Sequence, residues 1–149
     1  MSLIDTTDSS QTDSISFELD LKHQPKKVWR ALTDPELLQE WLLPVVEQKL
    51  ELKTGATFTF QTQAHPGWDG TVNCRLLEID APKSLRYAWG VPGLDTVLRF
   101  TLTETASGTL LSVVQSGFLP TQKHNFAGAR YGWNMMGNKL IGVLDARAA

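Results

Sequence analysis

The side chains best suited to chemistry in this sequence are three histidines and one cysteine, and their spacing assembles no local site. His23, His65 and His124 each lack a second ligand two or four residues away, so we predict no metal site built from them. Cys74 occupies an apolar phase of a strand pattern, which favours a buried structural thiol over a reactive one. A single cysteine forms no internal disulfide, and we therefore expect a cytoplasmic protein.

The sequence also lacks the common catalytic motifs. It contains no G-x-S-x-G pattern, and Ser116-Gly117 does not follow a strand-to-helix turn of the kind that presents a nucleophilic serine. The glycines of the last 25 or so residues lie within a helical pattern, so they form no phosphate-binding loop. We predict no catalytic residue, no metal and no cofactor.

Gln115 is the polar residue most suited to binding. It shares the strand phase of Leu111 and Val113, so its side chain is expected on the inner face of a sheet. An uncharged amide suits hydrogen bonding, either to a ligand or to the protein itself, better than it suits acid–base catalysis.

Composition narrows the class of protein. The chain has 149 residues, of which 42% are hydrophobic and 20% charged, and its net charge is −2. These values are ordinary for one globular domain with a sizeable core. They offer no basic field for nucleic acid and no apolar run long enough to cross a membrane.

Helical and strand signals alternate in the first 41 residues. Residues 1–14 are rich in Ser, Thr and Asp and are expected to form a disordered tail. The sequence ISFELDL at 15–21 alternates as a half-buried strand. Pro25 begins a first short helix, and Asp34-Pro35 ends it and caps a second that runs to Trp41.

The middle of the chain reads as antiparallel strands, and its end reads as one helix. Apolar residues at 129, 133, 136, 140 and 143 follow helical spacing, which predicts a long helix over about 123–146. A phase switch near residues 75–77 indicates a β-bulge. The expected fold is α+β, a single domain over 15–146 of about six or seven strands. The strands are predicted at about 45–53, around Phe58 and Phe60, and at about 70–79, 85–89, 98–102 and 111–113.

Five sequence blocks in this order resemble the START-like (SRPBCC) helix-grip superfamily. The blocks are VWRALTDPELLQEW at 28–41, Gly55 with Phe58, LEIDAPKSLRYAW at 77–89, GTLLSVVQSGF at 108–118 and Gly132-Trp133. Within that superfamily the chain is similar to the family named after the activator of the heat-shock chaperone ATPase, over about residues 15–145. The resemblance implies a curved antiparallel sheet around the C-terminal helix, as in the birch-pollen allergen, with an apolar cavity between them.

Aromatic residues would supply the walls of such a cavity. The resemblance places Trp41 at its mouth and Trp133 on its helical wall. The predicted ligand-binding set comprises Trp41, Phe58, Phe60, Trp89, Phe100, Gln115, Phe118, Trp133 and Met136.

Three classes of function follow. The leading prediction is non-catalytic binding of a small apolar or aromatic ligand. The resemblance also implies a protein-interaction module that regulates a chaperone ATPase in the stress response, although the full activators carry an N-terminal domain with no counterpart here. A third class is a cyclase-like enzyme, for which Tyr87, Arg99 and Gln115 are the candidate polar groups, with Arg99 expected to face solvent. The chain is expected to be a monomer or a homodimer.

Overall fold

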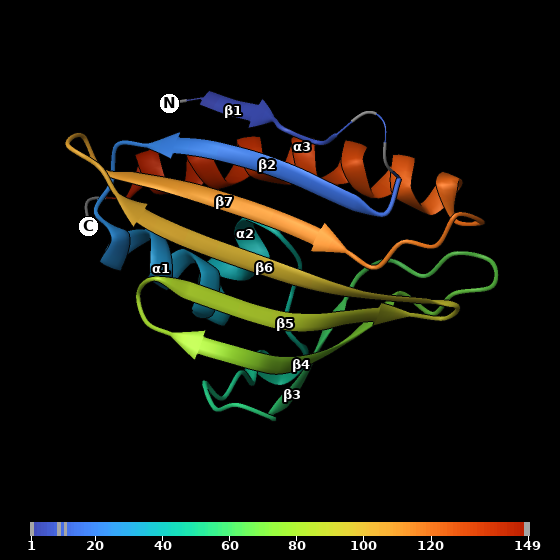
Figure 1. Cartoon of the computed structure of the whole chain (residues 1–149). Helices are drawn as coiled ribbons and strands as arrows, with labels where there is room; N and C mark the ends of the chain where they lie inside the picture. Colours follow the sequence, from blue (N-terminus) through green and yellow to red (C-terminus); the bar gives the residue numbers. More distant parts are fainter. Residues whose placement is uncertain (1, 9, 11, 148–149) are drawn as a thin grey trace.

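A long helix crosses one face of a curved antiparallel sheet, and two short helices close the end of the sheet (Figure 1). The structure is a computed structural model that describes residues 2–8, 10 and 12–147. The strands lie in the spatial order β1-β2-β7-β6-β5-β4-β3. They are β1 Ser2–Asp5, β2 Ser14–Leu21, β3 Thr57–Gln61, β4 Thr71–Asp80, β5 Ser84–Val91, β6 Leu94–Glu104 and β7 Thr109–Ser116. The helices are α1 Pro25–Thr33, α2 Pro35–Trp41 and α3 Lys123–Ala146, with a short 3-10 turn at Val46–Gln48. The predicted helix-grip architecture is confirmed.

The strands alternate between buried and exposed residues, as their sequences predict. In β2 the residues at 15, 17, 19 and 21 are all buried, and the inner face of β7 pairs with them. The register between β4 and β5 shifts between Leu76 and Glu78, which confirms the predicted bulge. Beyond the bulge Glu78 is partly exposed. Its Oε2 lies 3.6 Å from Arg86 Nε and 3.5 Å from Arg99 Nη2.

The two short helices form where proline and aspartate direct them. Pro25 occupies the first turn of α1, and the Asp34 side chain accepts a hydrogen bond of 3.0 Å from the Glu36 amide at the start of α2. The Trp41 indole N–H donates to the Ala31 carbonyl at 2.8 Å, which ties the end of α2 to α1. Both helices thereby hold the Trp41 ring over the inner face of the sheet.

Lys27 links α1 to the far end of α3. Its Nζ donates to the Leu144 carbonyl at 2.8 Å and also to the Arg147 carbonyl. A lysine at this place adds a donor to carbonyls at the end of α3 and complements the negative end of the helix dipole. His23 adds a contact of 3.0 Å between its Nε2 and Asp145 Oδ1. The C-terminal end of α3 is therefore fixed against α1.

The prediction of a disordered tail over residues 1–14 is wrong for the segment that forms β1. Ser2–Asp5 pairs with β2 and adds an edge strand to the sheet. Leu3 packs against the core, and the Asp5 carboxylate accepts a hydrogen bond of 2.7 Å from Arg130 of α3. Two consecutive apolar residues, Leu3 and Ile4, are too few to predict a strand in a polar sequence. The segment forms one because the free edge of β2 pairs with it.

The strand predicted at about 45–53 is also wrong. This segment contains the 3-10 turn, and a single bridge joins Val45 to Phe60. Glu47 and Gln48 have φ angles of 57° and 50°, in the left-handed region, which breaks an extended conformation. The segment therefore covers the end of the interior as a loop instead of pairing along β3.

Candidate functional site

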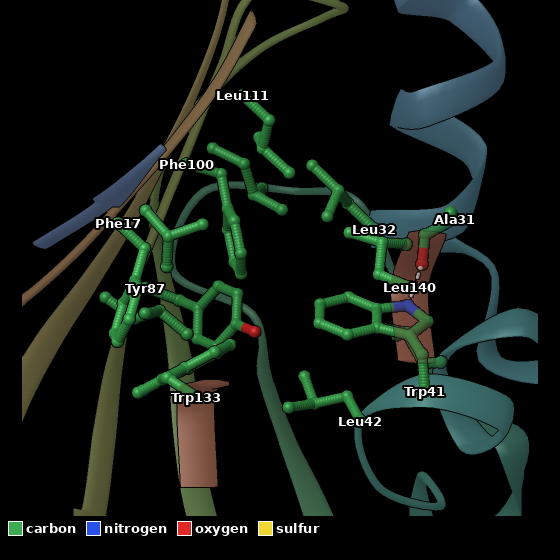
Figure 2. Packing of buried hydrophobic residues seen from close by; sticks show 14 of the residues in the cluster. Phe17, Ala31, Leu32, Trp41, Leu42, Tyr87, Phe100, Leu111, Trp133 and Leu140 are labelled. Atoms are coloured by element: carbon green, nitrogen blue, oxygen red, sulfur yellow. Dashed lines mark hydrogen bonds between the residues drawn. The ribbon is translucent and has the colours of Figure 1, made fainter. Parts of the chain in front are cut away.

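Seven aromatic rings form one continuous group between the sheet and the helices, here called the aromatic cluster. Its rings come from α2, β3, β5, β6 and α3, and neighbouring ring centroids lie between 5.1 and 6.5 Å apart. Such spacing is typical of edge-to-face and tilted aromatic contacts. The members are Trp41, Phe58, Phe60, Tyr87, Trp89, Phe100 and Trp133. Figure 2 shows Trp41, Tyr87, Phe100 and Trp133 facing a common centre.

Six of the nine residues predicted to bind a ligand belong to this cluster, and Gln115 lies beside it. The other two lie elsewhere. Phe118 pairs with Phe126 at the start of α3, with centroids 5.4 Å apart. Met136 is only partly buried on α3. Residues predicted from strand phase in the middle of the sheet are thus brought together, while Phe118 lies just beyond the end of β7.

Gln115 faces inward, as predicted, and its amide is engaged by the protein. Its Oε1 accepts a hydrogen bond of 2.7 Å from the Trp133 indole N–H, and its Nε2 donates to the Thr96 hydroxyl at 2.9 Å. Thr96 in turn donates to the Trp89 carbonyl at 2.9 Å. This series of bonds, here called the Gln115 chain, connects α3 to β7, β6 and β5. Of the two predicted alternatives, bonding to the protein is the one the geometry shows.

Tyr87 is buried among aromatic rings. It is 2% exposed, and its ring centroid lies 5.1 Å from that of Phe58 and 6.1 Å from that of Phe100. Its hydroxyl points toward the Trp41 indole in Figure 2, and it is not among the fully buried polar atoms that lack a hydrogen-bond partner. Burial, with a further contribution from Cys74, raises the pKa of Tyr87 well above its usual value of 10.0. The hydroxyl therefore stays protonated.

The interior contains very little empty space. The void between sheet and α3 measures about 10 Å³, and its walls include Leu3, Trp41, Trp133 and Gly137. A single water needs roughly 10–15 Å³. The open apolar cavity that the resemblance implies is thus almost completely filled by side chains in this structure.

Leu3 closes this void from the side of β1. A methyl group added at Gly137 would lie 3.0 Å from Leu3 Cδ1, so glycine at this position leaves room for the Leu3 side chain against α3. Leu3 is partly buried and belongs to an edge strand that pairs with a neighbour on one side only. It is the wall of the void with the least support.

Larger hollows lie on the outer surface beside the start of α1. Two open hollows of about 450 and 600 Å³ share Gln24 and Lys26, and no ring of the aromatic cluster lines either of them. The first is lined by Lys22, Lys26, Lys27 and Arg30 without an acidic side chain. These hollows are open to solvent, whereas the predicted site is in the interior.

The groups considered for catalysis are not brought together. Arg99 lies outside the sheet beside Glu78, as predicted, while Tyr87 and Gln115 point inward. Burial raises the pKa of the Cys74 thiol, which keeps it protonated and unreactive. Within residues 2–8, 10 and 12–147, no three potential metal-ligating side chains cluster. No helix in that part of the chain is long and apolar enough to span a membrane.

Sequence reasoning named Tyr87 as a candidate polar group, but it missed one residue that lines the interior void. Leu3 lies in a segment with only two consecutive apolar residues, which gave no strand signal.

A family model and solved structures match this chain. The model described as activator of Hsp90 ATPase homolog 1-like protein matches residues 22–145. The crystal structure of protein MLL2253 from Mesorhizobium loti is 34% identical, with a TM-score of 0.83, and the match covers 91% of this chain and 99% of that one. No curated protein sequence matches the chain.

Two further solved structures share the fold at lower identity. CalU16 from Micromonospora echinospora is 23% identical with a TM-score of 0.73, and the match covers 96% of this chain and 83% of that one. A protein from Arthrobacter aurescens is 19% identical with a TM-score of 0.80, over 97% and 92% of the two chains.

Proposed function

The chain belongs to the activator of Hsp90 ATPase homolog 1-like family, and from this premise we propose that it binds a small apolar or aromatic ligand between its sheet and α3. Binding is non-catalytic, because the buried polar groups are neutral and the charged ones lie outside. The aromatic cluster supports this proposal, since it supplies rigid apolar walls of the kind that line small-molecule sites.

The observation that carries the proposal is the void beside Trp41 and Trp133 and the way Leu3 closes it. Both tryptophans were predicted to border a site. The third wall is a leucine from an edge strand, facing a glycine on α3. A ligand that displaced Leu3 would reach both indole rings without breaking a strand pair inside the sheet. We interpret the filled interior as the closed form of the binding site.

The experiment uses N-phenyl-1-naphthylamine, a neutral apolar dye that fluoresces when it leaves water. We expect it to bind the protein and to quench tryptophan fluorescence. Leu3→Ala enlarges the void and removes a competing side chain, so it is expected to tighten binding by about tenfold, which corresponds to roughly 1.5 kcal/mol for burying one leucine side chain. Ile4→Ala is the matched control, because Ile4 is the next residue of β1 and is 56% exposed.

The two variants separate the outcomes. Tighter binding by Leu3→Ala alone supports a site beneath β1. Equal effects of Leu3→Ala and Ile4→Ala would place the dye elsewhere, for example in the open hollows beside α1. Absence of binding to all three proteins, together with no co-purifying small molecule in native mass spectrometry, would rule out the proposed function.

A further inference from the structure

We propose that the outward face of α3 is a homodimer interface, in which the α3 helices of two copies of this chain pack antiparallel across a two-fold axis near Met135. One side of α3 rests on the sheet (Figure 1) and borders the void through Trp133. The opposite side holds an exposed apolar patch. Tyr131 is 70% exposed and Met135 is 47% exposed, one helical turn apart. The inference is independent of the proposed ligand site, which lies on the other side of the same helix.

The patch belongs to a straight stripe of exposed residues along α3. Its members follow one another in steps of four and three residues, the spacing that keeps side chains on one side of a helix. A solvent-facing helix surface is normally charged, but between positions 128 and 142 this stripe carries no charge. The same spacing is typical of helices that pair with each other. The stripe comprises His124, Gly128, Tyr131, Met135, Asn138 and Gly142, all of them exposed.

The two glycines of the stripe have no packing role within one molecule. Setting aside the helix itself, a methyl group added at Gly128 or Gly142 would meet nothing within 4 Å. Glycine inside an exposed helix is nonetheless less stable than alanine. Gly137, on the buried side, differs because Leu3 lies 3.0 Å from the corresponding added atom. A second helix lying along the stripe would give positions 128 and 142 the close backbone approach that glycine permits.

The stripe is complementary to itself under two-fold symmetry. When Met135 faces the partner's Met135, antiparallel pairing sets each residue opposite the one equally far from position 135 in the other copy. Gly128 then lies opposite the partner's Gly142. Tyr131 lies opposite the partner's Lys139, which is exposed beside the stripe. An ammonium group over a tyrosine ring is a favourable cation–π contact. The pairing therefore sets small residues against small ones and a cation against a ring.

The charges at the two ends of α3 favour the antiparallel direction. The first turn contains Lys123 and His124 but no acidic residue, and the last turn contains Asp145 but no basic residue. Both signs oppose the helix dipole. Lys27 reaches the carbonyls of the last turn from α1, and His23 lies 3.0 Å from Asp145, yet 53% of the Asp145 side chain is exposed. Antiparallel pairing brings the Asp145 carboxylate close to the partner's Lys123, whereas parallel pairing would set like charges side by side.

The first test measures the oligomeric state of the full chain by analytical ultracentrifugation, from submicromolar to near-millimolar concentration. We expect a dimer that dissociates on dilution. Met135→Lys should weaken it by more than about tenfold, because two ammonium groups would meet at the axis. Gln63→Lys is the matched control, since it adds the same charge to an exposed loop, and it should leave the dissociation constant unchanged. Circular dichroism verifies that each variant is folded.

Cysteine cross-linking then tests the direction of pairing. With oxidised glutathione as the oxidant, Met135→Cys should form an intermolecular disulfide, because its two copies meet at the axis. Gly128→Cys should not, since antiparallel pairing separates its two copies by about 20 Å, far beyond the reach of a disulfide. The native Cys74 is buried and does not interfere.

Three results would overturn the inference. The first is a wild-type protein that stays monomeric at every concentration, and the second is a dimer that Met135→Lys leaves intact. The third is equal cross-linking of Gly128→Cys and Met135→Cys, which would mean that the helices do not pair antiparallel about position 135. None of these results bears on binding of the dye, so the proposed function is judged separately.

Discussion

Gln115 and Tyr87 are two buried polar residues in one interior, and their surroundings are opposite. The Gln115 amide accepts a hydrogen bond of 2.7 Å from the Trp133 indole and donates one of 2.9 Å to the Thr96 hydroxyl, so it connects α3 to the sheet. The Tyr87 hydroxyl lies among aromatic rings. The difference teaches that burial alone does not show what a polar residue does. The protein holds the Gln115 amide by hydrogen bonds at both ends, whereas it surrounds Tyr87 mainly with aromatic rings.

The largest expected effect in this comparison comes from Trp133, which belongs both to the aromatic cluster and to the Gln115 chain. We expect Trp133→Ala to lower the free energy of unfolding by about 3–5 kcal/mol, because it removes a buried ring. It also leaves Gln115 Oε1 without its donor. Urea unfolding followed by circular dichroism measures the change. Trp133→Phe keeps a ring and should cost clearly less, and equal losses for the two variants would show that the indole hydrogen bond, not ring packing, dominates.

Removing the amide itself should have the next largest effect. Gln115→Leu retains a similar volume but leaves the Trp133 indole N–H without an acceptor, so we expect a loss of about 1–3 kcal/mol in urea unfolding. Gln63→Leu is the control, because Gln63 is exposed and a surface change should stay within about 0.5 kcal/mol. If Gln115→Leu were as harmless as the control, the Gln115 chain would not stabilise the interior.

Alkaline pH should reveal the buried phenol. The pKa values of Tyr87 and Cys74 are raised in the folded state, so that state keeps protons which the unfolded state releases above its ordinary values of 10.0 and 9.0. Their contribution to stability is complete below pH 9 and is lost as pH rises, by about 1.4 kcal/mol per pH unit for each group. Tyr87→Phe should lose less stability than wild type between pH 10 and 11. Parallel curves would show that Tyr87 titrates as an exposed tyrosine does.

The smallest expected effect is that of Tyr87→Phe at neutral pH. Because aromatic rings are the main surroundings of Tyr87, the free energy of unfolding should stay within about 0.5 kcal/mol of wild type or increase slightly. The measurement is again urea unfolding, beside Gln115→Leu. A loss of 1 kcal/mol or more would mean that the hydroxyl is hydrogen-bonded in the free protein, and the contrast between the two residues would disappear.

Most of the fold was predictable because local signals agree with it. The period-two pattern of β2 and β7, the Asp34-Pro35 boundary and the helical spacing over 123–146 each persist over several residues. Two local exceptions were not readable. β1 forms because β2 offers it an edge, and the 45–53 segment turns where Glu47 and Gln48, two non-glycine residues, adopt positive φ.

The candidate site was predictable only as a set of inward-facing side chains. Strand phase placed Phe58, Phe60, Trp89 and Phe100 in the interior, and the structure brings them together. Whether those rings leave a cavity depends on distances of a few ångströms among elements far apart in the chain. The same reason hides the surroundings of the Tyr87 hydroxyl, because the neighbours of a side chain are a property of the packed interior and not of strand phase.

The bond between Lys27 and the end of α3 has a consequence for how the protein is made. Its two ends are 117 residues apart in the sequence, and β2 can complete its pairing only when β7 is available. Proteins dominated by such long-range contacts fold slowly, since distant segments must meet before they gain stability. On the ribosome α1 and α2 emerge long before α3, so their apolar faces wait without a partner during synthesis. We therefore expect the nascent chain to be prone to aggregation, and to need chaperones, until α3 emerges.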